Sequence, residues 1–250
     1  MKYAIITGSS KGLGASIAER LIKENVNIVS VARTENEGVR KLAAEKDLFY
    51  KHFTCDLSKV DEVDLVFSEI SDIIFSGNTE EVLLVNNAGV IEPIDKVGNL
   101  DTNKVNINIQ VNLLAPIVIS NLFLQKAKDC KLTIVNVTSG AGERPIQGWS
   151  TYCSTKAALN MFTKTTALEQ QSEQSKHVII GYSPGIMDTD MQVEIRSSSK
   201  DSFHDIETFK GYKEQGLLRS ADVVANALVD LLISGDVQSG TIYNVNELLK

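Results

Sequence analysis

Short β-rich runs alternate with longer amphipathic stretches along the whole chain of 250 residues. Runs such as YAIIT (3–7) and LTIVNV (132–137) are rich in apolar and β-branched residues, as buried strands are. Strands that alternate with helices are joined by right-handed crossovers into a parallel sheet that helices cover on both faces. The pattern therefore predicts one α/β domain over residues 1–250. The predicted strands are 3–7, 27–32, 49–54, 82–85, 132–137, 177–182 and 241–245.

The stretches between these strands have the period of helices. Between the first two strands, Leu13, Ile17, Leu21 and Ile22 recur on one face of a helix. Further helices are predicted near 60–74, 102–123, 151–171 and 221–233.

Composition excludes several classes of protein. The formal net charge is −7 and no cluster of Lys and Arg stands out, so we expect no nucleic-acid or membrane partner. The longest nearly apolar run, 113–119, is too short to cross a membrane. The N-terminal MKYAIITG enters a strand pattern directly, with no sign of a secretory leader. We therefore expect a cytoplasmic protein.

Cysteine and histidine usage agrees with that expectation. The three cysteines form no C-x-x-C pair and are odd in number, which suits free thiols in a reducing compartment. The three histidines lie far apart without cysteine or acidic neighbours at ligand spacing, so no metal site is predicted.

A glycine-rich turn follows the first predicted strand. Gly8, Gly12 and Gly14 give G-x-x-x-G-x-G, and a helix opens near Leu13. Glycines allow a sharp turn close to a pyrophosphate, and the helix start presents free N–H groups to the anion. A glycine-rich turn with no ligand is the alternative, but the position between strand and helix favours a dinucleotide site.

The end of the second strand predicts which dinucleotide binds. An acid there would hold the ribose 2′-hydroxyl of NAD, whereas a cation would accommodate the 2′-phosphate of NADP. The strand ends with Ala32 and Arg33, and Lys11 of the glycine loop can lie on the same side. These residues favour NADP(H), although Arg33 could instead be a solvated surface residue.

Tyr152 and Lys156 are four residues apart in a predicted helix and therefore share one face. Such a pair occurs by chance in many helices, but it also suits a catalytic acid with a cation beside it. An ammonium about 4 Å away contributes roughly 4 kcal/mol at an effective dielectric near 20, or about 3 pKa units. On this argument Lys156 would bring the phenol of Tyr152 to a pKa near 7.

The chain resembles the short-chain dehydrogenase/reductase family over nearly its whole length. The resemblance rests on five motifs in the family's order: TGSSKGLG (7–14), CDL (55–57), NNAG (86–89), VTSGAG (137–142) and SPGIMDT (183–189). It implies a Rossmann-type doubly wound sheet and a catalytic quartet of Ser139, Tyr152, Lys156 and Asn112. The cofactor contacts that it implies are Gly8, Ser10, Lys11, Gly12, Leu13, Gly14, Arg33, Asp56, Leu57, Asn87, Ala88, Gly89, Tyr152, Lys156, Pro184, Gly185, Ile186 and Thr189.

The quartet has a chemical rationale for carbonyl reduction. Tyr152 would give a proton to the carbonyl oxygen, and Ser139 would donate a hydrogen bond as charge develops there. Pro116 lies four residues after Asn112 and has no N–H, so the carbonyl of Asn112 loses its helical partner. In the family a water at such a carbonyl is thought to connect the asparagine to the lysine; a simple helix kink is the alternative.

A narrower resemblance concerns the substrate. GWSTYC (148–153) and YSPGIMDTDMQ (182–192) are similar to sepiapterin reductases, and the second segment also resembles bacterial benzil reductases. Asn244 stands where sepiapterin reductases have an aspartate that holds the pterin, which favours a broader carbonyl substrate. Trp149, Met187 and Met191, together with Ser139 and Asn244, are candidate pocket residues, and each could equally be a core residue.

The polar segment 188–217 is either a lid over this pocket or a surface insertion, and its place beyond the carboxyl end of a strand favours the lid.

The sequence thus predicts an NADPH-dependent carbonyl reductase acting on a ketone or aromatic 1,2-diketone. Alternatives are a sepiapterin reductase, an NAD(H)-linked secondary alcohol dehydrogenase, and an NADP sensor without catalysis. The resemblance also implies a homodimer or homotetramer built on the helices at 102–123 and 151–171.

Overall fold

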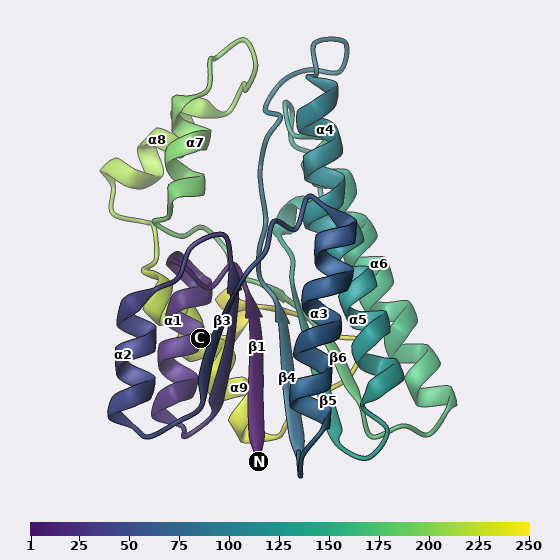
Figure 1. Ribbon diagram of the computed structural model, residues 1–250. Coiled ribbons are helices and arrows are strands. Elements are labelled where there is room, and N and C mark those ends of the chain that lie inside the picture. The colour runs from purple at the N-terminus through teal and green to yellow at the C-terminus, as the bar shows by residue number, and fades with distance from the viewer.

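A seven-stranded parallel sheet forms the centre of the computed structural model, which describes residues 1–250 (Figure 1). The strand order is β3-β2-β1-β4-β5-β6-β7. All seven predicted strands are confirmed, with ends shifted by one residue at most. The strands are β1 (Lys2–Thr7), β2 (Asn27–Ala32), β3 (Tyr50–Thr54), β4 (Glu81–Asn86), β5 (Lys131–Val137), β6 (Val178–Ser183) and β7 (Ile242–Asn244).

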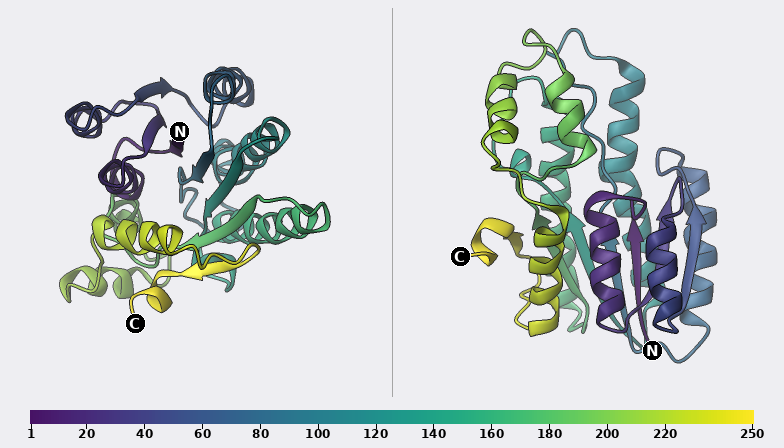
Figure 2. Two further views of the ribbon diagram at one scale, coloured as in Figure 1. Left: turned by 90° about the horizontal axis from the view of Figure 1, so that it is seen from below. Right: turned by 90° about the vertical axis from the view of Figure 1, so that its left-hand side faces the viewer.

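Helices connect the strands and cover both faces of the sheet, as predicted (Figure 2). Helices α1 (Gly12–Lys23), α2 (Glu37–Glu45) and α9 (Ala221–Ser234) pack on one face. Helices α3 (Val60–Phe75), α5 (Ala115–Lys126) and α6 (Ser150–Ser172) lie on the other. The shorter elements are α4 (Thr102–Ile109), α7 (Asp190–Ser197), α8 (Ile206–Glu214) and α10 (Val245–Leu248).

Alternation along the strands divides the core into two layers. Ile6 of β1 and Ile28 of β2 pack toward α1 and α9, whereas Ile5 and Val29 pack toward α3 and α5. Successive side chains of a strand point to opposite faces, so a strand buried on both faces needs apolar residues at nearly every position. This requirement explains why the strands are recognisable in the sequence as short apolar runs.

The strand order reverses between β1 and β4. The chain proceeds outward from β1 to β2 and β3, then returns to β4 on the other side of β1. In such sheets ligands bind in the crevice beyond the carboxyl ends of the strands at this switch point. The glycine-rich turn after β1 and the NNAG segment after β4 meet there, because β1 and β4 are hydrogen-bonded neighbours.

The helix predicted over 102–123 is interrupted by a π-helical turn, Gln110–Leu114, and continues as α5. Pro116 stands in the first turn of α5. The N–H of Ala115 bonds the carbonyl of Gln110, five residues back, instead of the usual four. Proline cannot donate to the carbonyl four residues before it, so the ladder shifts its spacing at this point.

The combined segment Thr102–Lys126 is, by length and composition alone, apolar enough to cross a membrane. Nearly half of its most apolar window is buried inside the fold. Ala115, Ile119 and Phe123 of this segment pack with α3 against the sheet. The apolar character therefore serves the core, as in the central helices of many globular proteins.

The segment 188–217 leaves the sheet after β6 and stands beyond the carboxyl ends of the strands (Figure 1). The sequence predicts an irregular segment here, but the structure contains helices α7 and α8. A bridge between Met187 and Arg219 closes its base, with hydrogen bonds from Asp188 N to Arg219 O and from Arg219 N to Ile186 O.

Phe123 tests the layer between α3, α5 and the sheet. It is fully buried and meets Phe67 and Phe75 edge to face, with ring centroids 6.4 and 5.7 Å away. We expect Phe123→Ala to lower the free energy of unfolding by about 3–4 kcal/mol, because it removes packing and leaves a cavity. Urea denaturation with an unchanged m-value would measure the loss. Phe49→Ala, at a 39% exposed site, should cost less than about 1 kcal/mol.

Candidate active site

The glycine-rich turn has the geometry of an anion site. Gly8 and Gly12 have φ of +67° and +56°, values that other residues rarely adopt. Helix α1 begins at Gly12, no side chain caps its N-terminus, and its first turn holds no acidic residue. The free N–H groups and the positive end of the helix dipole are therefore available to a phosphate group.

Thr7 and Asn87 hold this turn against the segment after β4. The hydroxyl of Thr7 accepts hydrogen bonds from the N–H groups of Asn87 and Ala88, at 2.9 and 3.0 Å. The Asn87 amide donates to the carbonyls of Thr7 and Gly8, at 2.8 and 3.2 Å. A Cβ on Gly14 would lie 2.4 Å from the Gly8 carbonyl oxygen, so α1 can approach this closely only with glycine. Thr7 was not predicted, although it stands directly before Gly8.

The residues predicted to discriminate the dinucleotide lie at one end of this crevice. Arg33 is exposed and forms no ion pair within 4.0 Å. Lys11 is exposed and pairs with Asp190 in the first turn of α7. Such surface pairs contribute only about 0–1 kcal/mol, so Lys11 can exchange Asp190 for another anion.

Asp56 lies close enough to Arg33 to feel its charge. Burial alone would raise the pKa of Asp56, but hydrogen bonds from Ser58 and the cations Lys59 and Arg33 bring it below its usual value. Leu57, the next residue, is buried. Ser10 offers its carbonyl to the Asn36 amide at 2.9 Å, which ties the glycine turn to the start of α2.

The SPGIMDT segment reaches the glycine turn from β6. Thr189 Cγ2 would lie 3.7 Å from a Cβ on Gly12. Pro184 is buried and Ile186 half-buried, whereas Gly185 is exposed with φ of +68°. Two motifs with predicted cofactor contacts therefore lie side by side at the carboxyl ends of β1 and β6.

Tyr152 and Lys156 lie on one face of α6, as predicted, and both are buried. The Lys156 ammonium is 5.7 Å from the centroid of the Tyr152 ring and donates to the Val137 carbonyl at 2.8 Å. Ser139 follows β5 two residues after Val137, and its hydroxyl accepts a hydrogen bond from Ala141 N–H. The predicted acid, cation and hydroxyl are thus brought together at the carboxyl end of β5.

The predicted pKa of Tyr152 was wrong in direction. Burial raises the pKa of Tyr152 to about 12, against a smaller lowering by the Ser139 hydroxyl. The Lys156 ammonium lies over the ring and bonds Val137, and burial lowers the pKa of Lys156 to about 8. The Coulomb argument considered only the attraction between the two groups and left out the cost of removing each charge from water.

Asn112 joins this group from the π-helical turn and is fully buried. Its side chain accepts from Val90 N–H at 2.9 Å and donates to the Val90 carbonyl at 2.7 Å. A Cβ on Gly89 would lie 3.3 Å from Asn112 Oδ1 and 3.7 Å from Lys156 Nζ. Because Gly89 has no side chain, Asn112 and Lys156 can both pack closely against its backbone. The water predicted at the Asn112 carbonyl stays a prediction.

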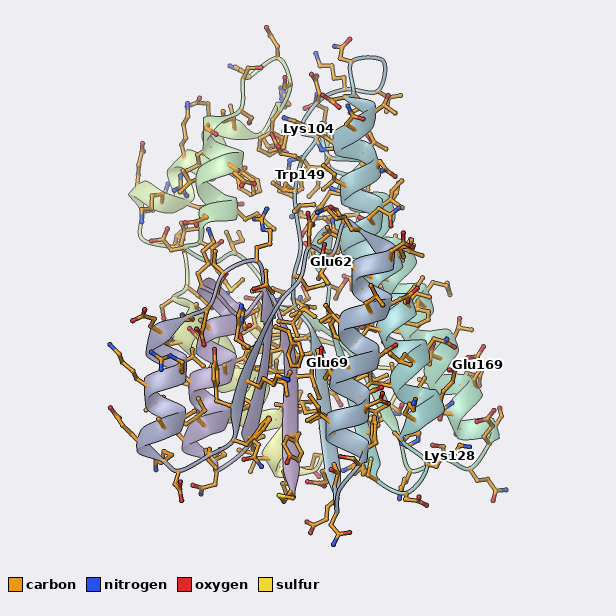
Figure 3. All side chains as sticks on the ribbon, in the orientation of Figure 1. Glu62, Glu69, Lys104, Lys128, Trp149 and Glu169 are labelled. Carbon is orange, nitrogen blue, oxygen red and sulfur yellow. The ribbon has the colours of Figure 1, made fainter.

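Trp149 lies at the start of α6 beside the α7–α8 segment (Figure 3). Its ring stacks on Phe203 and meets Phe209 and Tyr152 edge to face, with centroids 5.1, 5.4 and 5.8 Å away. The Trp149 indole nitrogen is buried without a hydrogen-bond partner. Met191 packs on the same cluster, so two of the predicted pocket residues adjoin Tyr152.

Met187 and Asn244 have other surroundings. Met187 is half-buried and packs against the core layer that contains α1 and α9, and its role in the pocket stays a prediction. Asn244 ends β7, and its side-chain oxygen caps α10 by accepting from Asn246 N–H at 2.9 Å.

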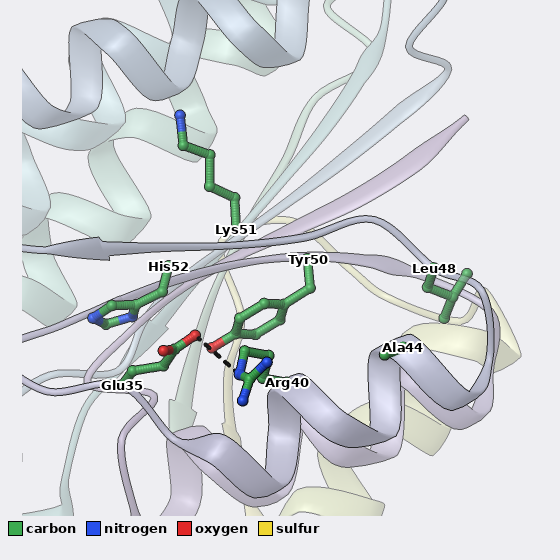
Figure 4. Close-up of a pocket in the computed structure, with 7 residues that line it drawn as sticks. All are labelled: Glu35, Arg40, Ala44, Leu48, Tyr50, Lys51 and His52. Carbon is green, nitrogen blue, oxygen red and sulfur yellow. Dashed lines mark ion pairs between the residues drawn. The ribbon is translucent and has the colours of Figure 1, made fainter.

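A surface hollow of about 460 Å³ lies elsewhere, between α2 and the edge strand β3 (Figure 4). None of the quartet contributes to it. The residues that line it are Glu35, Arg40, Ala44, Leu48, Tyr50, Lys51 and His52. Its Tyr50 hydroxyl and His52 Nε2 are buried without partners.

A family model described as short chain dehydrogenase matches residues 2–200. The chain belongs to this family of oxidoreductases, and the family predicted from the motifs is confirmed. The chain is 39% identical to the benzil reductase ((S)-benzoin forming) of Bacillus subtilis (strain 168) over 251 residues, with 100% of both chains covered.

More distant relatives match nearly the whole chain. Sepiapterin reductase of Bos taurus is 28% identical, with 94% of this chain and 91% of that protein covered. The crystal structure of the KRED1-Pglu enzyme is similar with a TM-score of 0.83 and 27% identity, over 97% of this chain and 100% of that one. The narrower resemblance to benzil and sepiapterin reductases is thereby confirmed.

Burial of Lys156 predicts a gain in stability when its charge is removed. Below pH 8 the ammonium is charged in both the folded and the unfolded chain, and only the folded chain bears the desolvation cost. We expect Lys156→Met to raise the free energy of unfolding by about 1–2 kcal/mol at pH 6.5. The gain is smaller than the free energy that corresponds to the full pKa shift, because the variant also loses the hydrogen bond to Val137. The difference should shrink as pH rises from 8 to 10.5, where the folded protein releases its proton first.

Urea denaturation of both proteins between pH 6.5 and 10 measures this difference. A Lys156→Met variant that is less stable than the wild type at pH 6.5 would contradict the assignment. Lys164→Met, on the exposed side of the same helix, is the control and should change stability by less than about 0.5 kcal/mol.

Proposed function

We propose that the protein is an NADPH-dependent carbonyl reductase with an aromatic 1,2-diketone as its preferred substrate class. The observation that carries this proposal is the buried pair of Tyr152 and Lys156 beside the half-buried Ser139 at the carboxyl end of β5, next to the glycine-rich turn. A sensor of the dinucleotide has no need to bury a lysine at such a cost, whereas a proton-transfer site does.

The raised pKa of Tyr152 suits reduction. At neutral pH the phenol keeps its proton, which is the form that can protonate a carbonyl oxygen. The Ser139 hydroxyl can donate to the same oxygen as negative charge develops. Lys156, with a pKa of about 8, can hold or release a proton close to neutral pH and is suited to restore the phenol. NADPH, when bound, supplies the hydride.

The preference for NADPH rests on Arg33 and Lys11. No acidic side chain stands at the end of β2 to hold a 2′-hydroxyl, and Arg33 is exposed and free of ion pairs. The uncapped start of α1 would hold the pyrophosphate, and Arg33 with Lys11 would face the 2′-phosphate. Asp56, half-buried near Arg33, would meet the adenine end.

The preference for an aromatic substrate rests on the surroundings of Tyr152. Trp149, Phe203, Phe209 and Met191 form an apolar cluster beside the phenol, which suits flat aromatic rings. The 39% identity to a benzil reductase over the whole chain supports the same class. Asn244 in place of a carboxylate speaks against a pterin, and it also engages the backbone of α10.

The segment 188–217 is proposed as the cover of this pocket, since α7 and α8 contribute Ile195 and Ile206 to the cluster around Trp149. Exposed apolar side chains on α4 and α6, namely Ile107, Ile109, Met161 and Leu168, support pairing of two copies through these helices. We infer a homodimer or homotetramer of a cytoplasmic enzyme.

Oxidation of NADPH at 340 nm with benzil, a second aromatic 1,2-diketone, sepiapterin and an aliphatic ketone tests the proposed function. We expect turnover of the diketones and little turnover of sepiapterin. Tyr152→Phe should lower kcat at least a thousandfold with dinucleotide affinity nearly unchanged, because it removes only the proton donor. Strong turnover of sepiapterin would instead favour a pterin reductase. Tight NADPH binding without any turnover would favour a sensor.

Arg33 gives a separate test of the dinucleotide preference. Arg33→Ser should raise the KM for NADPH about 10- to 100-fold, because a charge-assisted hydrogen bond contributes about 1.5–3 kcal/mol. The KM for NADH should change less than twofold. Arg40→Ser, an exposed arginine nearby on α2, is the matched control and should leave both values unchanged. An equal loss for both dinucleotides in Arg33→Ser would contradict the assignment.

A further inference from the structure

Asn108 is a fully buried asparagine that the sequence analysis did not single out. It lies near the end of α4, one turn before Asn112. Burial of an amide side chain costs free energy unless its donors and acceptor are hydrogen-bonded, so buried amides are found with hydrogen-bond partners. The contacts of Asn108 therefore indicate what it does.

The side-chain oxygen of Asn108 joins two elements of the site. It accepts a hydrogen bond from Asn112 Nδ2 at 2.8 Å and another from Thr155 Oγ1 at 3.0 Å. Thr155 lies on α6 between Tyr152 and Lys156, and its hydroxyl is also 3.1 Å from the Tyr152 carbonyl. One oxygen thus connects the π-helical turn to the helix that carries the acid and the cation.

The side-chain nitrogen of Asn108 holds the segment after β4. It donates to the carbonyl of Glu92 at 2.6 Å and to that of Val90 at 3.2 Å. Asn112 bonds both the N–H and the carbonyl of Val90. The two asparagines therefore grip the same short stretch of backbone, which directly follows the NNAG segment of the dinucleotide crevice.

The orientation of this amide is determined by its neighbours. Its oxygen faces the Asn112 amide nitrogen and its own nitrogen faces backbone carbonyls, so a flipped amide would lose the bonds to Asn112, Glu92 and Val90. A leucine has a similar shape but can neither donate nor accept a hydrogen bond. An aspartate can accept from Asn112 and Thr155, but it can donate to a carbonyl only while it is protonated.

We propose that Asn108 is a positioning residue that braces Asn112 against α6 and so sets the distance between Asn112 and Lys156. Both side chains lie against Gly89, where a Cβ would be 3.3 Å from Asn112 Oδ1 and 3.7 Å from Lys156 Nζ, so a displacement of Asn112 changes its separation from Lys156 across this glycine. Asn108 acts through Asn112 and Thr155 and does not touch the reacting atoms. This inference rests on the proposed carbonyl-reductase activity.

Threonine variants on α6 provide a matched pair for the test. Thr155 and Thr163 are both buried, and each hydroxyl lies within hydrogen-bond distance of a buried asparagine and of a carbonyl of its own helix. The Thr155 hydroxyl donates toward its asparagine, whereas the Thr163 hydroxyl accepts from its asparagine and donates to the Leu159 carbonyl. Thr163 contacts Asn136, away from the quartet. We expect Thr155→Val to lower kcat for benzil about 3- to 10-fold and Thr163→Val to leave it within twofold, with similar losses of stability.

Asn108→Leu should lower kcat for benzil about 10- to 100-fold, while the KM for NADPH stays within twofold. The double variant Asn108→Leu with Thr155→Val should be no slower than Asn108→Leu alone, because both remove the same bond. Additive losses, an unchanged kcat in Asn108→Leu, or equal losses in the two threonine variants would each overturn the brace.

Asn108→Asp gives a readout that a merely structural residue would not change. While protonated, the acid can donate to Glu92 or Val90 and still accept from Asn112 and Thr155. Burial raises the pKa of a carboxyl group, so we expect near wild-type kcat at pH 5.5 and an additional loss of at least tenfold by pH 8.5. The titratable side chains in this part of the site are Tyr152 and Lys156 on α6, the exposed Glu92–Lys104 pair, and Asp101 and Glu194, whose charges act on that pair. A constant ratio to the wild type across this range would overturn the proposal.

Wild-type turnover separates the two proposals. Absence of turnover on every carbonyl compound would refute the proposed function. The role of Asn108 in holding Asn112 would then be tested by a crystal structure of Asn108→Leu. A rotated Asn112 that has lost its bonds to Val90 would support the brace, and an unmoved Asn112 would overturn it. Thermal unfolding of each variant identifies a failure to fold, in which case Thr155→Val and Asn108→Asp carry the test.

Discussion

Burial of the Lys156 ammonium is the constraint on which the arrangement of the site depends. A charge removed from water needs compensating partners, and here a backbone carbonyl at the end of β5 and the face of the Tyr152 ring supply them. The same burial moves the pKa of the lysine toward neutrality and that of the tyrosine away from it. Burial of the pair is therefore the common origin of the cost in stability and of both pKa shifts.

The surroundings of this lysine are assembled from five separate parts of the chain. β5 provides the carbonyl, α6 the tyrosine and lysine, the π-helical turn Asn112, and the segment after β4 the backbone that Asn112 grips. The glycine turn after β1 is tied to that same segment through Thr7 and Asn87. The parallel sheet makes this convergence possible, since the carboxyl ends of β1, β4 and β5 meet at one edge.

The aromatic cluster shows how the start of α6 and the segment 188–217 depend on each other. Trp149 at the start of α6 has Phe203 and Phe209 as its main partners, and both belong to that segment. A Cβ on Gly148 would lie 2.3 Å from the Ser202 carbonyl oxygen, so the segment rests directly on the loop before α6. Any movement of this segment away from α6 must separate aromatic surfaces, which links its position to the packing of Trp149.

The sequence alone determined the strands, most of the long helices and the glycine turn, because these depend on local periodicity and on spacing within single elements. The quartet was predicted from the motifs that carry the family resemblance, since its members come from three separate elements. It did not reveal α2, α7 or α8, whose short amphipathic patterns lie in polar stretches. Only the tertiary structure decided that Met187 belongs to the core and Met191 to the aromatic cluster, and that Asn108 contacts Asn112 and Thr155 at once. It also decided the direction of the Tyr152 pKa, because burial is a property of the assembled fold and not of the spacing between two residues.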